Sequence, residues 1–309
     1  MFSDPDPRER FLPEGPRAVV VEGRDALLWV NIQSGKAAQT GKLHMRFWDT
    51  GEHRAFTLSE RPGFVLPTNK PGVVCIGQGK EVGCYDLASG QWTHWAQIPD
   101  NNPRTIINDA EVLPGGKAIV FGTKDTLFKD AIAELYLFTI DDRKISTLAT
   151  AQLCSNGKVF MHDSELYLYD IDTPKRTVVK YRLEVEKRSL SLIEVALDLS
   201  GLAGFPDGMV AGPDASLIIA FYNPAMASYG IAQRFCLQRR YAIEEWRVPG
   251  SPRVTCPLFV NRKGQVLLVL TTADEGMDPD QQKASPHAGC LFSVVTNLTN
   301  VPATSIIAL

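Results

Sequence analysis

Three oxygen-bearing side chains, those of Glu14, Asn156 and Asp207, form the most chemically informative set in the sequence. Together they offer two carboxylates and one amide, with no sulfur or imidazole. Such hard oxygen donors suit Ca²⁺, Mg²⁺ or Mn²⁺ better than a typical zinc site. Asn108 adds a second amide. The alternative is that the dipeptides beginning at Asn156 and Asp207, Asn-Gly and Asp-Gly, are ordinary turns, because both pairs are common in tight turns.

The spacing of these residues helps to decide between a shared site and independent turns. Each opens one of six segments with a shared form: a small or polar residue, a short apolar strand, a turn and a longer apolar strand. The segments begin at Glu14, Gly63, Asn108, Asn156, Asp207 and Thr255, so successive starts lie 49, 45, 48, 51 and 48 residues apart. Because four oxygen-bearing side chains share one phase of this repeat, we favour a common site over independent turns.

The repeat also predicts the fold. Its apolar segments, such as AVVV and SLIIAFY, are short, rich in β-branched or aromatic residues, and bounded by Gly, Pro, Asn or Asp. A second hairpin follows in each unit, which gives four strands in about 48 residues, the size of one propeller blade. We therefore predict an all-β chain: one domain, residues 1–309, forming a six-bladed β-propeller with four-stranded blades around a central channel. Two stacked β-sandwiches, the alternative, would not require equal spacing and should show a linker.

The first strand of each propeller blade lines the central channel, so the four polar residues meet only if the ring closes. We expect ring closure to mix the chain ends in one blade. A strand near residues 18–22 would then pair with C-terminal strands near residues 291–295. Deleting the first 22 residues should in that case impair folding as well as metal binding.

Composition narrows the possible partners and location. A hydrophobic fraction of 44% with 22% charged residues is typical of a folded globular chain. The 32 basic and 35 acidic residues leave no positive excess to neutralise a nucleic-acid backbone. No apolar run approaches the roughly 20 residues that span a bilayer, the N-terminus lacks the apolar stretch of a signal peptide, and the six cysteines form no CxxC pair. We expect a cytoplasmic protein with no nucleic-acid or membrane partner.

Several segments resemble the regucalcin, senescence marker protein and gluconolactonase family. The matching stretches are EGP (14–16), NDAEVLPGGKAIVFGT (108–123), the segment 155–184 that begins SNGKVF, FPDGM (205–209), the segment 253–277 that begins RVTCPLF, and HAGCLFSV (287–294). The resemblance runs in order over nearly the whole chain. It implies a six-bladed propeller with one divalent metal ion in the channel and activity on sugar lactones. It also implies that Glu14, Asn156 and Asp207 bind the metal and that Asn108 contacts the substrate or a metal-bound water.

The sequence departs from the family pattern at two polar positions. Ile106 stands where the family often has Arg, and Leu127 stands where some animal members have a Glu that contacts sugar hydroxyls. Arg104 and Asp125 lie nearby and are candidate substitutes. A pocket without these donors loses little when a lactone lacks hydroxyls. We therefore expect simple or partly deoxygenated lactones to be hydrolysed at least comparably to gluconolactone.

These observations predict a metal-dependent lactonase. The ion would act as a Lewis acid on the lactone carbonyl, and Asp207 would be the candidate general base for the attacking water. Glu14 and Asn156 would fix the ion, and Asn108 would orient the ring oxygens. Ca²⁺ is the expected ion, with Mg²⁺, Mn²⁺ or Zn²⁺ as alternatives, and the protein would be a monomer or weak dimer. Two other functions stay open: a non-catalytic calcium-binding or interaction propeller, and a metal-dependent esterase or phosphoesterase.

Overall fold

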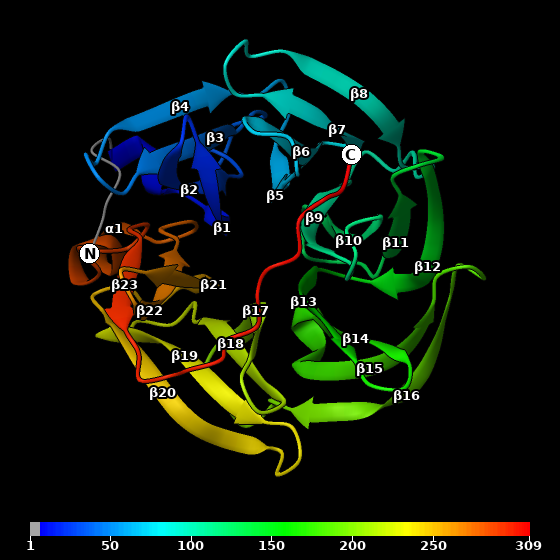
Figure 1. The fold of residues 1–309 in the computed structure, drawn as a ribbon. Helices are drawn as coiled ribbons and strands as arrows, with labels where there is room; N and C mark the ends of the chain where they lie inside the picture. The colour runs from blue at the N-terminus through cyan, green and yellow to red at the C-terminus, as the bar shows by residue number, and fades with distance from the viewer. Residues whose placement is uncertain (1–6) are drawn as a thin grey trace.

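The short β-branched and aromatic segments become antiparallel strands in the computed structural model, which describes residues 7–309. Six sheets surround one axis, with β1, β5, β9, β13, β17 and β21 innermost (Figure 1). The sequence-based prediction of a six-bladed β-propeller is confirmed. Five blades have four strands, and the sixth has three within the described residues.

The blades follow one another along the chain. Blade one contains β1 (Pro13–Val21), β2 (Arg24–Asn31), β3 (Lys42–Phe47) and β4 (His53–Thr57), and blade two contains β5 (Pro62–Pro67), β6 (Val73–Gln78), β7 (Glu81–Asp86) and β8 (Trp92–Gln97). Blade three contains β9 (Thr105–Val112), β10 (Ala118–Asp125), β11 (Ala133–Thr139) and β12 (Lys144–Gln152), and blade four contains β13 (Ser155–His162), β14 (Leu166–Asp172), β15 (Thr177–Glu184) and β16 (Ser189–Asp198). Blade five contains β17 (Phe205–Gly212), β18 (Ser216–Tyr222), β19 (Tyr229–Cys236) and β20 (Tyr241–Pro249), and blade six contains β21 (Val254–Arg262), β22 (Gln265–Thr272) and β23 (Phe292–Val295). The described residues also form three short helices: η1 (Pro7–Arg10) before β1, η2 (Thr173–Lys175) between β14 and β15, and α1 (Pro279–Ala284) between β22 and β23.

The second strand of each blade is a largely apolar run in the sequence because the strand is buried. All eight residues of β10 are buried, as are six of the seven in β18, because neighbouring blades cover both faces of these strands. The outer strand β12 consists of exposed and half-buried residues instead, apart from the buried Gln152 at its end. The core thus lies between blades, and the inner strands are held from both sides. No helix in residues 7–309 combines the length and apolar character that crossing a bilayer requires.

Ring closure differs from the sequence-based prediction, which was wrong. β1 pairs with β2 inside blade one, and β23 pairs with β22, so the two chain ends do not share a blade. A strand that carries Glu14 must be innermost in its own blade, and it cannot also complete the outside of blade six. Closure uses hydrogen bonds between the blades instead: the Thr255 hydroxyl donates to the Pro13 carbonyl at 2.8 Å, and the Glu275 amide donates to the Phe11 carbonyl at 2.9 Å.

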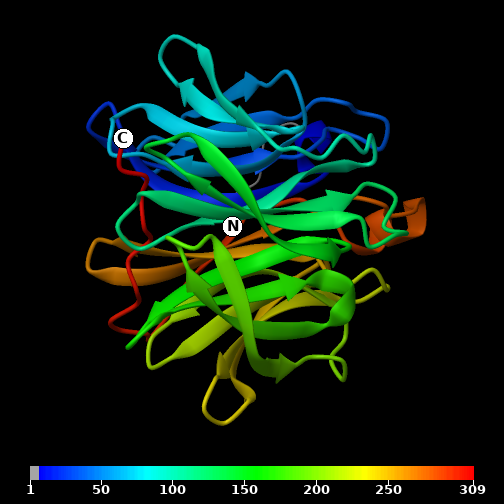
Figure 2. The ribbon, with the colours of Figure 1, turned by 90° about the vertical axis from the view of Figure 1, so that its right-hand side faces the viewer.

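Residues 296–309 leave β23 and cross the face of the propeller opposite α1 (Figures 1 and 2). The end of this tail lies between turns of blades two and three. The amide of the fully buried Ile307 donates to the Pro67 carbonyl, and the Ala308 amide donates to the Gly116 carbonyl, both at 2.9 Å. The tail thus covers the channel end where the inner strands finish. The residues that open the six repeated segments lie at the other end of the channel, where the inner strands begin.

Candidate metal and substrate site

One backbone irregularity recurs in all six blades, beside the residues that open the six repeated segments. At this point each inner strand carries one residue more than its partner strand. The register shifts lie at Glu14/Arg17, Pro62/Phe64, Ile107/Ala110, Asn156/Lys158, Pro206/Met209 and Val254/Pro257. Such β-bulges re-aim side chains and are common beside functional sites. The phase positions are therefore structurally equivalent.

The glycines beside the candidate ligands have a packing role. A Cβ atom on Gly157 would lie 2.7 Å from the carbonyl oxygen of Asp207, and one on Gly208 would lie 2.7 Å from the carbonyl oxygen of Thr255. Both glycines lie inside strands, so the interpretation of Asn-Gly and Asp-Gly as ordinary turns does not hold. Glycine is needed here because the backbones of neighbouring inner strands approach too closely for a side chain.

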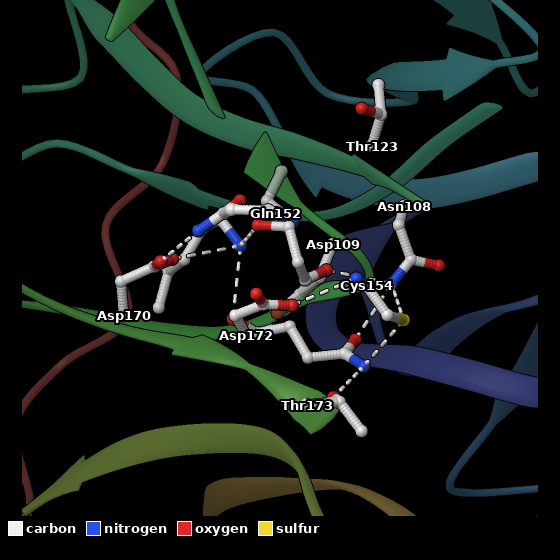
Figure 3. Close-up of polar contacts among 12 residues, drawn as sticks. Asn108, Asp109, Thr123, Gln152, Cys154, Asp170, Asp172 and Thr173 are labelled. Carbon is white, nitrogen blue, oxygen red and sulfur yellow. Dashed lines mark hydrogen bonds and ion pairs between the residues drawn. The ribbon is translucent and has the colours of Figure 1, made fainter. Parts of the chain in front are cut away.

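Two amide side chains from adjacent blades are joined at this end of the channel (Figure 3). Nδ2 of Asn108 donates to Oδ1 of Asn156 at 2.8 Å and to the carbonyl oxygen of Ser155 at 2.9 Å. Nδ2 of Asn156 donates in turn to Oγ1 of Thr173 at 2.8 Å. In Figure 3 the side-chain oxygen of Asn108 points away from this network. The NH₂ group of each amide thus donates to protein acceptors, and the amide oxygen keeps a lone pair that is available to a ligand.

Two carboxylates, one from the half-buried Glu14 and one from the buried Asp207, lie close enough to repel one another. Burial raises the pKa of Glu14 well above its usual range, and repulsion from Asp207 and then Asp109 raises it further. Burial also raises the pKa of Asp207, with Asp109 again adding repulsion. Oδ1 of Asp207 is buried and accepts no hydrogen bond from the described residues. A buried carboxylate oxygen that accepts no hydrogen bond and lies near a second carboxylate is stabilised by a cation.

The donor set fits a hard divalent ion. It combines the two carboxylates with the oxygen of Asn156, and oxygen-only sites of this kind are typical of Ca²⁺ or Mg²⁺. Within residues 7–309 no three His, Cys, Asp or Glu side chains form a metal-binding group, so an ion here would depend on amide oxygen as well. The assignment of Glu14, Asn156 and Asp207 as ligands, and of Asn108 as a substrate contact, stays a prediction.

Lys124 is a charged residue at this site that the sequence-based reasoning missed. It lies on β10, is 8% exposed, and makes a backbone bridge to Cys154 at the entrance of blade four. Its ammonium group lowers the pKa of both Glu14 and Asp207, against the larger effect of burial. The only sequence signal was one lysine at the end of an apolar strand.

Arg104 and Asp125, considered as substitutes for sugar-binding groups, form an ion pair with each other. Nε of Arg104 donates to Oδ1 of Asp125 at 3.1 Å, and its Nη2 lies 2.8 Å from Oδ2 of Asp130. Asp125 also accepts backbone N–H groups of Leu127, Lys129 and Asp130, and the Arg104 guanidinium holds its pKa below its usual range. Both residues therefore shape the loop between β10 and β11. On that loop Leu127 is exposed, whereas Ile106 on β9 is buried.

Comparisons with known proteins identify the family and the fold of this chain. A sequence profile for the SMP-30/Gluconolactonase/LRE-like region matches residues 12–273. The chain belongs to the SMP-30/gluconolactonase/LRE family. Two relatives of this family member are an uncharacterised protein from Sulfolobus acidocaldarius, 28% identical over 85% of this chain and 88% of the relative, and the L-arabinolactonase of Azospirillum brasilense, 26% identical over 88% and 84%. The crystal structure of regucalcin from Agrobacterium tumefaciens, described as a calcium-binding protein, superposes with a TM-score of 0.80 at 22% identity, covering 97% of this chain and 93% of that one.

Proposed function

We propose that this member of the SMP-30/gluconolactonase/LRE family is a lactonase that requires a divalent metal ion held by Glu14, Asn156 and Asp207. The observation that carries the proposal is the buried Oδ1 of Asp207, which accepts no hydrogen bond from the described residues and lies near a second carboxylate. A relative that covers most of the chain and is named for lactonase activity supports the same reaction class. Ca²⁺ as the ion, a cytoplasmic location and a monomer or weak dimer remain predictions from the sequence.

The reaction would divide among the channel residues. When bound, the ion supplies a Lewis acid that polarises the lactone carbonyl. Asp207 accepts a proton from the attacking water while the water oxygen bonds to the carbonyl carbon. The same proton passes to the ring oxygen as the ring C–O bond breaks, which yields the open hydroxy acid. The free oxygen of Asn108 orients the substrate, and Lys124 adds positive charge where negative charge develops.

A second candidate function is calcium binding without catalysis. The regucalcin of similar fold is described as a calcium-binding protein, and an oxygen-only donor set serves that role equally well. A structural ion would be closed off by protein ligands, whereas a catalytic ion needs positions open to water. An esterase or phosphoesterase on the same scaffold is the remaining alternative.

A pH-stat assay tests the proposal. The purified protein would be offered gluconolactone, a pentonolactone and simple γ- and δ-lactones, together with a simple ester and a phosphoester, with and without EDTA. We expect acid release from lactones that EDTA abolishes and Ca²⁺ or Mn²⁺ restores. Simple lactones should be hydrolysed at least comparably to gluconolactone, because Arg104 and Asp125 are paired with each other. Activity that EDTA leaves intact, or no lactone turnover under any metal, would contradict the proposal.

A further inference from the structure

The hydroxyl group of Thr173 joins the two blades that carry Asn156 and Asp207. Thr173 opens η2, and its Oγ1 lies 2.8 Å from Nδ2 of Asn156 and 2.9 Å from the carbonyl oxygen of Pro206, the residue before Asp207. We propose that Thr173 is a positioning residue that sets the metal affinity of this site. The inference rests on the proposed function, since it assumes that Asn156 and Asp207 share an ion.

Counting protons fixes the orientation of the Asn156 amide. A carbonyl oxygen only accepts, so the single hydroxyl proton of Thr173 goes to Pro206. The hydroxyl oxygen must then accept from Asn156, and only the NH₂ end of that amide can donate. Oδ1 of Asn156 is thereby turned the other way, toward Asn108.

The Asn108 side gives the same answer independently. Nδ2 of Asn108 donates to the carbonyl oxygen of Ser155, so the end of Asn108 that faces blade four is its NH₂ group. That group needs an acceptor on Asn156, which again requires Oδ1 there. If the Asn156 amide were flipped, its NH₂ group would face the NH₂ group of Asn108, and neither group could accept a hydrogen bond. The oxygen of Asn156 is therefore presented in one orientation, as a metal ligand requires.

The position of Thr173 is itself fixed by the backbone around it. Its amide donates to the carbonyl oxygen of Cys154 at 2.9 Å. Oδ1 of Asp172 accepts the amides of Leu153 and Cys154, each at 3.0 Å, and so holds η2 against the start of β13. Through Pro206 the same hydroxyl restrains the peptide that leads into Asp207. Two candidate ligands on neighbouring blades thus depend on one side chain.

The test compares two substitutions at Thr173 in the full-length protein. Thr173→Val keeps the shape and removes both hydrogen bonds, whereas Thr173→Ser keeps the hydroxyl. Metal affinity would be measured by calorimetric titration of Ca²⁺ into metal-free protein. Partners that orient metal ligands typically change affinity about 10–100-fold. We expect Thr173→Val to weaken Ca²⁺ binding at least about 10-fold and the serine variant to remain close to wild type.

The outcomes separate this inference from the proposed function. If the wild-type protein binds neither Ca²⁺ nor Mn²⁺, or binds the ion as well after Asp207→Ala, the metal site itself is wrong. If the wild type binds one ion through Asp207 but Thr173→Val binds it equally, the positioning role is wrong. Thr173 is only half-buried, outside the apolar core. Thr173→Ala serves as a second variant without the hydroxyl, and unchanged affinity in either folded variant overturns the inference.

Discussion

Asp207 and Asn108 occupy equivalent bulges but differ in what their side chains contact. Oδ1 of Asp207 accepts no hydrogen bond from residues 7–309, whereas the NH₂ group of Asn108 donates to oxygens of Ser155 and Asn156. We expect Asp207→Ala to lose bound metal and lactone turnover together. Asn108→Ala should keep the metal and lose turnover by roughly 100-fold, the scale of removing one positioned polar group in an active site. Metal content by mass spectrometry and turnover in the pH-stat check both, and loss of the metal from Asn108→Ala would contradict the division of roles.

Substitution of Lys124 should strengthen metal binding, whereas Asp207→Ala should abolish it. Its positive charge near Glu14 and Asp207 opposes a bound cation, since like charges repel and the site is partly shielded from water. Lys124→Met should therefore bind Ca²⁺ several-fold more tightly, as measured by calorimetry. Lys117→Met is the matched control, because Lys117 is exposed and pairs with Asp141 at the other end of blade three. Unchanged or weaker binding in Lys124→Met would show that the ammonium group does not face the ion.

The sequence allowed some of these residues to be predicted but not others. Glu14, Asn108, Asn156 and Asp207 were found because a repeat places equal phases at equal positions around an axis. Lys124 and Thr173 lie off that phase, on β10 and η2. Their roles depend on which way a side chain turns and on a 2.9 Å contact between blades, and neither property follows from spacing.

At the scale of elements, the bulged inner strands are the feature that places the ligands. Their glycines are the most sensitive positions, because a side chain there would meet the next blade. On Gly157 a Cβ would lie 2.7 Å from the carbonyl oxygen of Asp207 and 2.9 Å from Cβ of Met209, at a φ of +29°. We expect Gly157→Ala to lower the free energy of unfolding by about 1–3 kcal/mol, the usual effect of overpacking.

Gly201→Ala provides the control for that measurement. Gly201 lies in the connection between blades four and five, and nothing lies within 4 Å of the position a Cβ would take. Its free energy of unfolding should stay within about 0.5 kcal/mol of wild type. Urea denaturation monitored by tryptophan fluorescence compares the two. Equal stability of both variants would contradict the account of close inter-blade packing.

Strand periodicity and the 48-residue repeat were enough to predict the blades, but not how the ring closes. The prediction of a mixed blade treated β1 as free to pair with the C-terminal strands, although Glu14 already made it the innermost strand of blade one. Hydrogen bonds such as that from Thr255 to Pro13 join residues 242 positions apart, and no local pattern in the sequence marks them.

On the scale of the whole molecule, the two ends of the channel have separate roles. The tail covers one end, and the bulges with Glu14, Asn156 and Asp207 lie at the other. Ile307 is fully buried between blades two and three, whereas its neighbour Ile306 is 46% exposed. Ile307→Ala should lower the free energy of unfolding by about 2–4 kcal/mol, as for other buried isoleucines, and Ile306→Ala by much less.

The Ca²⁺ affinity of Ile307→Ala tests whether the tail affects the candidate metal site as well as the stability of the protein. Because the tail and the candidate ligands lie at opposite ends of the inner strands, Ile307→Ala should bind Ca²⁺ as tightly as the wild type at temperatures where it stays folded. Thermal denaturation and calorimetric titration give the two quantities. A marked loss of Ca²⁺ affinity in folded Ile307→Ala would show that the tail influences the far end of the channel.

The central claim is that the ring brings Glu14, Asn156 and Asp207 to one cation. Anomalous diffraction from crystals soaked in Mn²⁺ tests it most directly, because Mn²⁺ takes the same hard oxygen ligands and its position can be seen without assuming it. The account predicts one strong peak inside the channel, about 2.0–2.6 Å from side-chain oxygens of all three residues. A peak that excludes any of the three, or no peak in the channel while lactone turnover persists, would contradict it.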